Sequence, residues 1–368
     1  MSEPLRVAMT LEQCWHRVPG GTAVAALGMA RGLTATSGTT VIGVAARHRH
    51  LPEPEWRPPV PVAHLGLPRI ALYESWHRWR RPAVEGATGP VDLIHATSLA
   101  VPPRSAPLAV TIHDLAFVRD PTHFTRHGLS FFKRGLACAL ADADMILCPS
   151  RATADDCLEA GFAGGRVHVV PLGVDQTAID PGEAEASVRR LGIDGRFVVW
   201  AGTIEPRKNL PRLLRAWRRV DTDAELVLVG PTGWNEDLAE LVSGTPRVRS
   251  LGWVGRRDLT ALYARADLLC WPSLWEGFGF PVLEAMVQST AVITSAGTST
   301  EELAGDAGRL VDPRDETAMA EALQDLLDDA SLRDRLAQRG RERARAYTWE
   351  ATAERLLDAY ELGIGAVR

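Results

Sequence analysis

The sequence predicts an α/β protein with two doubly wound parallel sheets, and three observations support this fold class. Short β-branched runs alternate with helical periods in the first half of the chain. The same alternation restarts after residue 186. The segment Ala143–Ser150 (ADMILCPS) is echoed by Ala266–Ser273 (ADLLCWPS), as expected when two halves share a fold. At 368 residues, the chain is long enough for two domains with separate cores.

The elements of the first half are read from apolar runs and helical periodicity. Strands are expected at Arg6–Thr10, Thr40–Ala45, Val91–His95, Leu108–His113, Met145–Cys148 and Val167–Pro171. Helices are expected at Thr22–Leu33, Ser130–Ala141 and Ala152–Ala160. Residues 50–62 contain five prolines and predict an extended surface loop.

A stretch with Pro, Gly and acidic residues, from Gly173 to Ala186, predicts a linker. Strands follow at Arg196–Gly202, Ala224–Gly230, Val248–Val254, Asp267–Trp271 and Ala291–Ser295. After Arg314 the chain is charged and helical, and a final amphipathic helix runs from Trp349 to about Leu362. Residues 1–178 and 186–348 are therefore the predicted domains.

Composition excludes several classes of protein. A formal charge of −5 argues against a general nucleic-acid binder, and the five cysteines form no C-x-x-C pair. No apolar stretch approaches the roughly 18 residues that span a bilayer, and the N-terminus lacks a secretory pattern. We expect a cytoplasmic protein, and we leave open a peripheral contact with the inner face of the cell membrane.

The stretch from Trp271 to Glu284 is the strongest candidate for a ligand site. A strand ends in a Gly-rich turn, and a helix starts near Pro281. The glycines allow close approach of the backbone to a ligand, and the helix start presents free N–H groups. Glu276 and Glu284 bracket the turn, which suits a ligand with hydroxyls and phosphates, such as a sugar nucleotide. A plain strand-to-helix turn with solvated glutamates is the alternative.

Lys208 is one of only two lysines among 41 basic residues. It follows a strand, within Gly202–Asn209 (GTIEPRKN), and precedes a helix, where a cation and backbone N–H groups can hold a diphosphate. A surface Arg-Lys pair is the alternative. His113 also ends a predicted strand, although Asp114 would serve equally as a cap for the next segment. A structural role is at least as plausible for His95.

The sequence EGFGFPVLEA, starting at Glu276, resembles the signature of the retaining family 4 glycosyltransferases. The resemblance covers nearly the whole chain. It implies the GT-B fold, in which two facing Rossmann-like domains border an inter-domain cleft. It further implies that the first domain binds the acceptor, that the second binds the nucleotide-sugar donor, and that the terminal helix, residues 349–368, returns to the first domain.

The same resemblance implies roles for individual residues. Glu276, His113 and Lys208 would be catalytic, with Glu276 and His113 at the donor sugar and Lys208 at the diphosphate. The other implied donor-binding residues are Arg207, Gly277, Phe278, Gly279, Leu283, Glu284 and Val254. Gly20 and Gly21 would form a phosphate and acceptor loop, and Glu302 matches a family glutamate without a derived role. The family has a second cation where this chain has Thr203, which leaves open whether Arg207 replaces it.

Two Asp-x-Asp triplets, Asp142–Asp144 and Asp221–Asp223, precede predicted strands and therefore lie at the wrong sheet edge for a ligand. We expect no bound metal and no cofactor besides the donor substrate. No carboxylate stands out as a nucleophile opposite Glu276, which agrees with the front-face route that the family implies.

We expect a retaining hexosyltransferase, with a mannose-type donor favoured by the EPRKN segment. Its partners would be a nucleotide sugar and a glycan or lipid-linked acceptor in cell-envelope synthesis, and no nucleic acid. The segment Trp76–Arg81 (WHRWRR) suggests contact with anionic lipid, or a solvated helix. A UDP-sugar epimerase of similar fold and a silent sugar-nucleotide-binding subunit remain as alternatives.

Overall fold

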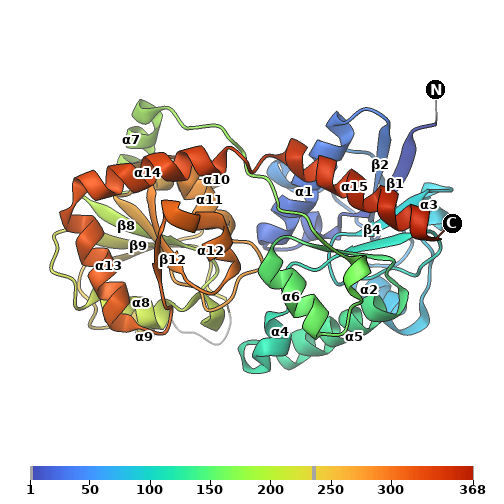
Figure 1. The fold of residues 1–368 in the computed structure, drawn as a ribbon, viewed down its shortest axis with the longest axis horizontal. Helices are drawn as coiled ribbons and strands as arrows, with labels where there is room; N and C mark the ends of the chain where they lie inside the picture. Colours follow the sequence, from blue (N-terminus) through green and yellow to red (C-terminus); the bar gives the residue numbers. More distant parts are fainter. Residues whose placement is uncertain (1–2, 234–237, 368) are drawn as a thin grey trace. The chain divides into compact units, whose positions relative to one another are not determined.

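The computed structural model describes residues 3–233 and 238–367, and the chain forms two compact units. The first unit comprises Met1–Gly173 and Tyr347–Arg368, and the second comprises Val174–Ala346. Each unit contains one parallel sheet with helices on both faces (Figure 1). The predicted class, two doubly wound α/β units, is therefore confirmed.

The first unit has a seven-stranded sheet in the order β3-β2-β1-β4-β5-β6-β7. Its strands are β1 (Leu5–Thr10), β2 (Thr39–Ala45), β3 (Val62–His64), β4 (Leu93–Ala96), β5 (Leu108–Thr111), β6 (Met145–Cys148) and β7 (Val167–Val169). Its helices are α1 (Gly20–Ala35), α2 (Arg69–Trp79), α3 (Glu85–Thr88), α4 (Ala116–Arg119), α5 (Arg126–Asp142), α6 (Arg151–Glu159) and α15 (Trp349–Val367). Short 3-10 turns are η1 (Glu12–Trp15), η2 (Pro54–Trp56), η3 (Pro121–His123) and η4 (Gly164–Arg166).

The second unit has a six-stranded sheet in the order β10-β9-β8-β11-β12-β13. Its strands are β8 (Phe197–Ala201), β9 (Glu225–Val229), β10 (Val248–Gly252), β11 (Leu268–Trp271), β12 (Ala291–Ser295) and β13 (Arg309–Val311). Its helices are α7 (Pro181–Arg190), α8 (Leu210–Trp217), α9 (Leu238–Val242), α10 (Arg256–Arg265), α11 (Phe280–Val287), α12 (Ser299–Ala304), α13 (Glu316–Asp328) and α14 (Ala330–Ala344). The 3-10 turns are η5 (Pro206–Lys208) and η6 (Gly305–Ala307).

The central strands are buried along their whole length because helices cover both faces of each sheet. All residues of β6 (MILC) and β11 (LLCW) are buried, as are those of β8 and β12. Continuous apolar runs of this kind are typical of parallel sheets. The two strands that sequence reasoning missed, β3 and β13, are three-residue edge strands with too short a pattern to detect.

The predicted linker from Gly173 to Ala186 is wrong in its second half, because α7 begins there. The Asp180 side chain accepts hydrogen bonds from the backbone N–H groups of Gly182 (2.9 Å) and Glu183 (3.0 Å). Pro181 occupies the first turn, where a missing N–H costs nothing. The Asp-Pro pair is thus a helix start rather than a break in structure.

Helix α15 packs against α1 of the first unit through glycines. A Cβ on Gly28 would lie 2.2 Å from the Trp349 ring, and one on Gly32 would lie 2.4 Å from the Trp349 carbonyl oxygen. Farther along the helix, the Tyr360 hydroxyl contacts His95 Nδ1 at 2.7 Å. The terminal helix therefore belongs to the first unit, although more than 170 residues separate it in the sequence from Gly173, where the first segment of that unit ends.

Candidate active site

The candidate site of the second unit lies at the point where its strand order reverses. Strands β8 and β11 are neighbours in the sheet, while β9 and β12 extend it in opposite directions. Ligands of open α/β sheets bind outside the carboxyl ends of strands at such a switch point. The segment Glu205–Lys208 follows β8, and Ser273–Glu276 follows β11, so the topology brings both segments together.

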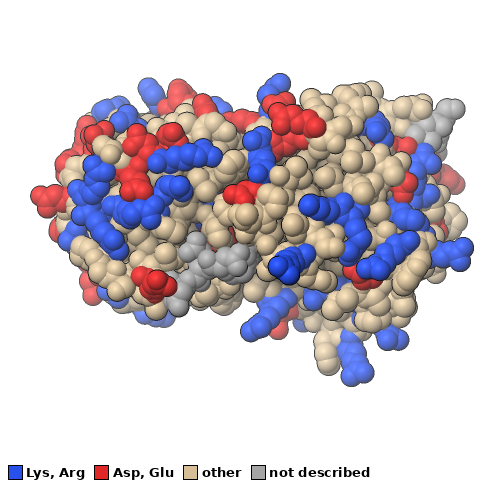
Figure 2. Space-filling view, turned by 90° about the horizontal axis from the view of Figure 1, so that it is seen from below, with Lys and Arg blue, Asp and Glu red and all other residues tan. Residues whose placement is uncertain are grey.

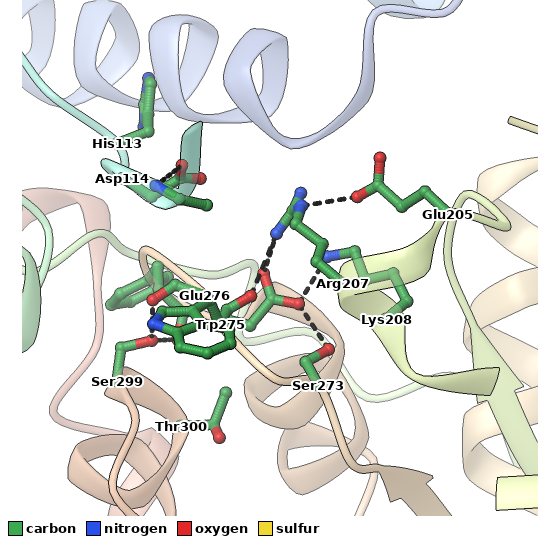
Figure 3. Close-up of polar contacts among 12 residues, drawn as sticks. His113, Asp114, Glu205, Arg207, Lys208, Ser273, Trp275, Glu276, Ser299 and Thr300 are labelled. Carbon is green, nitrogen blue, oxygen red and sulfur yellow. Dashed lines mark hydrogen bonds and ion pairs between the residues drawn. The ribbon is translucent and has the colours of Figure 1, made fainter. Parts of the chain in front are cut away.

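The Glu276 carboxylate is the centre of this site (Figure 3). It accepts hydrogen bonds from Lys208 Nζ at 2.5 Å and from Arg207 Nη1 at 3.0 Å. The Ser273 hydroxyl donates a third hydrogen bond at 2.7 Å. The side chains of Glu276 and Lys208 are only 8% and 10% exposed. Lys208 Nζ also lies 4.8 Å from the centre of the Trp271 ring, within the range of a cation–π contact.

The charges in this cluster are balanced. Burial raises the pKa of Glu276, but the adjacent Lys208 and Arg207 outweigh it and lower the pKa to about 2. Burial lowers the pKa of Lys208, as does Arg207, whereas Glu276 and Glu205 oppose that shift. Arg207 Nε pairs with the buried Glu205 at 2.6 Å. Two carboxylates thus face two cations in a site that is largely shielded from water.

Hydrogen bonds to the backbone hold the two loops in register. Asn209 adopts a left-handed conformation (φ 61°), and its side-chain amide donates to the carbonyl oxygens of Pro272 (2.9 Å) and Pro313 (2.6 Å). The Ser299 hydroxyl donates to the carbonyl oxygen of Glu276 at 2.7 Å. Sequence reasoning missed Glu205, Ser273, Asn209 and Ser299 as members of the site. Glu205 and Asn209 lie in the GTIEPRKN segment, of which only the cations Arg207 and Lys208 were predicted to join the site.

The Gly-rich turn has the predicted geometry. Gly279 adopts φ 114°, and a Cβ there would lie 2.6 Å from Thr300 Cγ2, so this position requires glycine. Helix α11 begins at the next residue, with Pro281 in its first turn. Phe278 and Leu283 are buried in the core of the second unit.

Glu284 does not join the Glu276 cluster but lies against α10. Burial raises the pKa of Glu284, while Arg256 and the Tyr263 hydroxyl oppose the shift. A small cavity of about 50 Å³ lies beside the carboxyl group. Its lining also includes Asp175, Thr177, Leu259, Thr260 and Gln288. The two glutamates of the motif therefore occupy different surroundings within the second unit.

The remaining predicted residues of the second unit are near its strand ends. Val254 follows β10 and is partly buried. The predicted base-contact loop after Gly230 includes residues 234–237, which lie outside the described residues. Thr203 packs beside Gly233, since a Cβ on that glycine would lie 2.7 Å from Thr203 Cγ2. Glu302 contributes its backbone carbonyl oxygen, which accepts a hydrogen bond from Arg343 at 2.8 Å.

In the first unit, His113 Nε2 donates to the Thr97 carbonyl oxygen at 3.1 Å. Asp114 accepts from the Ala116 N–H at 3.1 Å, as the capping alternative expected. His95 is fully buried between Thr111 and the terminal helix, and burial lowers its pKa to about 3. Its role is structural. Gly20 has φ 63° and opens α1.

The hypothesis that Trp76–Arg81 binds lipid is wrong about which of its side chains are exposed at the surface. Trp76 is 1% exposed and donates to the Pro82 carbonyl oxygen at 3.0 Å. Arg80 pairs with Asp142 and with three backbone carbonyl oxygens. Trp79 is 68% exposed, and Arg78 is exposed beside Glu74. On the face drawn in Figure 2, basic side chains are scattered among neutral and acidic ones rather than joined into one surface.

None of the described helices is long and apolar enough to span a bilayer. In residues 3–233 and 238–367, no three His, Cys, Asp or Glu side chains are grouped so as to hold a metal ion. The Asp-x-Asp triplets precede β6 and β9, as expected, and Asp144 caps the start of β5 by accepting from the Leu108 N–H at 2.9 Å.

Comparison with known proteins agrees with the fold. The model of the family "Glycosyltransferase Family 4" matches residues 19–178, and that of "Glycosyl transferases group 1" matches residues 195–329. The O-antigen chain mannosyltransferase B of Escherichia coli is 30% identical over 283 residues, 73% of this chain and 74% of the relative. The MMP alpha-(1->4)-mannosyltransferase of Mycolicibacterium hassiacum is 33% identical over 60% of this chain and 55% of its own length.

Solved structures show the same fold. HepE of Anabaena, solved in complex with UDP and glucose, matches with a TM-score of 0.74 and 18% identity, covering 96% of this chain and 98% of the other. Sucrose-phosphate synthase from Thermosynechococcus elongatus matches with a TM-score of 0.77 and 21% identity over 98% of this chain and 100% of the other. Topology and family matches agree, and the chain belongs to the family 4 glycosyltransferases, with the GT-B fold.

Proposed function

We propose that the protein transfers a hexose, with retention of configuration, from a nucleoside-diphosphate sugar to a hydroxyl acceptor. The observation that carries this proposal is the buried Lys208–Glu276–Arg207 cluster at the β8/β11 switch point. Negative charge builds on the leaving diphosphate in the transition state, and two desolvated cations stabilise it there more strongly than in water.

The balanced charges of the cluster suggest how donor binding and Glu276 are coupled. Without a donor, the cations are paired with Glu276 and Glu205. We propose that a diphosphate takes over part of this pairing and releases the Glu276 oxygens to accept hydrogen bonds from sugar hydroxyls. With a pKa of about 2, Glu276 is ionised at any physiological pH and is a strong acceptor.

Glu284 is the proposed ribose ligand. Its carboxyl borders the 50 Å³ cavity between α10 and α11, and vicinal hydroxyls are natural donors to a carboxylate. Lys208 and Arg207 are the cations nearest to Glu276 in this site. We propose that these protein groups meet the charge of the diphosphate without a metal ion.

The proposed donor sugar is mannose, which the names of both mannosyltransferase relatives support. HepE was solved with UDP, so UDP-glucose is the second donor to test. The name of the Escherichia coli relative refers to an O-antigen chain, and we propose a growing glycan of the cell envelope as the acceptor.

A thermal-shift series tests this function directly. GDP, UDP, ADP or dTDP at about 100 times its Kd stabilises the fold by about 2.7 kcal/mol, and the matching nucleoside does far less. Lys208→Met removes the ammonium group but keeps the length of the side chain, and we expect it to abolish most of that difference. Lys133→Met, in α5 of the first unit, is the matched control. A diphosphate shift that survives in Lys208→Met contradicts the proposal.

A further inference from the structure

The ammonium group of Lys208 has two close neighbours of different kinds. One is the Glu276 carboxylate, whose Oε1 accepts a hydrogen bond from Lys208 Nζ at 2.5 Å. The other is the Trp271 ring, whose centroid lies 4.8 Å from Lys208 Nζ. The face of an indole ring attracts a cation, and the attraction is stronger where water is excluded. The Lys208 side chain is 10% exposed and Trp271 is 1% exposed, so water is largely excluded from this contact.

The Trp271 ring is held in place by its surroundings. Trp271 is the last residue of β11, and its ring lies against Gly202, which follows β8. A Cβ on Gly202 would lie 2.5 Å from Trp271 Cη2, so the ring occupies the space that a side chain would need. Gly202 does not have a positive φ, so glycine serves space here and not backbone conformation. The Trp200 ring packs on Trp271 with centroids 5.5 Å apart, and little room remains for the indole to turn away from Lys208.

Hydrogen bonding does not account for an indole at this position. Trp271 Nε1 is buried and has no hydrogen-bond partner among the described residues. A buried unpaired donor is costly, and a leucine or phenylalanine in the core would avoid that cost. Within the described part of the chain, Trp200 Nε1 is also unpaired, so the two side chains contribute aromatic surface rather than hydrogen bonds. The ring face next to Lys208 is the feature that distinguishes Trp271 from another large apolar residue.

The charged groups around Lys208 show why an uncharged neighbour matters. In the described part of the chain they are Arg207 and Glu205, from the segment of η5, and Glu276, from the loop after β11. Burial and Arg207 lower the pKa of Lys208, whereas Glu276 and Glu205 raise it. Under the proposed function, a diphosphate takes over part of the pairing with Glu276. The attraction of the Trp271 ring remains unchanged during that exchange, because it involves no ionised partner.

We propose that Trp271 is a positioning residue for Lys208, whose ammonium group the indole face holds in its charged form where the donor diphosphate meets it. The contact itself stands on the geometry, and its role in donor binding rests on the proposed function. An ammonium group has three N–H donors, and Glu276 accepts one of them. A tryptophan that only filled the core would contribute to stability and would leave the properties of Lys208 unaffected.

NMR of the full chain labelled with ε-13C-lysine tests the contact, because the sequence contains only two lysines, Lys133 and Lys208. The Lys133→Arg variant assigns the two signals. In the wild type we expect an upfield Lys208 signal, since its ε-CH2 group lies beside an aromatic ring. In Trp271→Leu the upfield shift should disappear, and the ratio of neutral to charged Lys208 at a given alkaline pH should rise about tenfold, equivalent to about 1.4 kcal/mol. Trp271→Phe should lie between the two, because a phenyl face attracts a cation more weakly than an indole.

Trp217→Leu is the matched control. Trp217 is also fully buried in the second unit, but it lies at the end of α8 and its Nε1 donates to the Pro246 carbonyl oxygen. This variant should lower the Tm and leave the Lys208 signal as in the wild type. A wild-type Lys208 signal in Trp271→Leu, or an equal change in Trp217→Leu, overturns the inference. Should Trp271→Leu not fold, Trp271→Phe decides by the same criterion.

Titration with GDP and with UDP separates this inference from the proposed function. Trp271→Leu should bind the diphosphate about tenfold more weakly than the wild type, while Trp217→Leu should bind it equally well. If neither diphosphate binds the wild type, the donor proposal fails, and the Lys208 signal still decides whether Trp271 holds the lysine. Wild-type affinity in a folded Trp271→Leu variant would overturn the role of Trp271 in donor binding.

Discussion

Replacing Glu276 by Gln removes one negative charge from the buried cluster and keeps the shape of the side chain. Lys208 then lies in a nearly dry site without its closest anion, because Glu205 is engaged with Arg207. Removing one partner of a buried ion pair costs about 3–5 kcal/mol. For a unit of this size, 1 kcal/mol corresponds to about 2–4 °C in Tm, so we expect a drop on the order of 10 °C.

The diagnostic result for Glu276→Gln is its response to ligand. A nucleoside diphosphate supplies the anion that the variant lacks, so the stabilisation by GDP or UDP should be larger in the variant than in the wild type. Sugar transfer should fall by about 10² or more, since the charged acceptor for the sugar hydroxyls is lost. Differential scanning fluorimetry and a diphosphate-release assay measure both effects, and Glu321→Gln, at an exposed position of α13, is the control. An unchanged Tm together with an unchanged ligand shift would refute the coupled ion pair.

Three further predictions concern other parts of the molecule. Glu205→Gln should raise the donor KM several-fold with a smaller effect on kcat, because Arg207 loses the carboxylate that orients it. If the variant has the same KM and kcat as the wild type, Glu205 serves folding alone. Burial lowers the pKa of His95 from 6.5 to about 3, so neutral His95 stabilises the fold fully above pH 6.5. Below pH 6.5 the free energy of unfolding should fall by up to about 1.4 kcal/mol per pH unit. In His95→Asn, melting curves should therefore show a smaller loss of Tm as the pH drops. Trp79 is exposed, so Trp79→Ala should weaken sedimentation with anionic vesicles without changing the Tm. Trp76 is buried, so Trp76→Ala should instead lower the free energy of unfolding by about 3–5 kcal/mol. Equal sedimentation by the wild type and Trp79→Ala would show that this helix does not contact lipid.

The fold was predictable from the sequence because buried parallel strands leave continuous apolar runs. The bounds of β6 and β12 were predicted to the residue. Helix α7 was missed because its acidic first turn resembles a linker in composition, although Asp180 and Pro181 are a recognisable helix start. In α2, the lipid-contact hypothesis ignored the spacing of Leu72 and Trp76, which places both on the buried face.

The site was predictable in part. Strand ends and a rare lysine identified Lys208 and Glu276, but sequence spacing could not show that they pair directly across two loops 68 residues apart. The alternative of solvated glutamates is wrong for Glu276, since its side chain is 8% exposed. Glu205 was not identified because only the cations of its segment were expected to bind a ligand. Its position at the switch point depends on the order of the strands, which appears only in the fold.

The most direct test of the account is the release of nucleoside diphosphate from GDP-mannose and UDP-glucose by purified protein in the presence of EDTA. The account predicts release that needs no metal, that increases when a sugar acceptor is added, and that falls by about 10² or more in both Lys208→Met and Glu276→Gln. Lys133→Met should be as active as the wild type. Release that is strictly metal-dependent, or that is equal in Lys208→Met and the wild type, would contradict the role of the Lys208–Glu276–Arg207 cluster as the donor site.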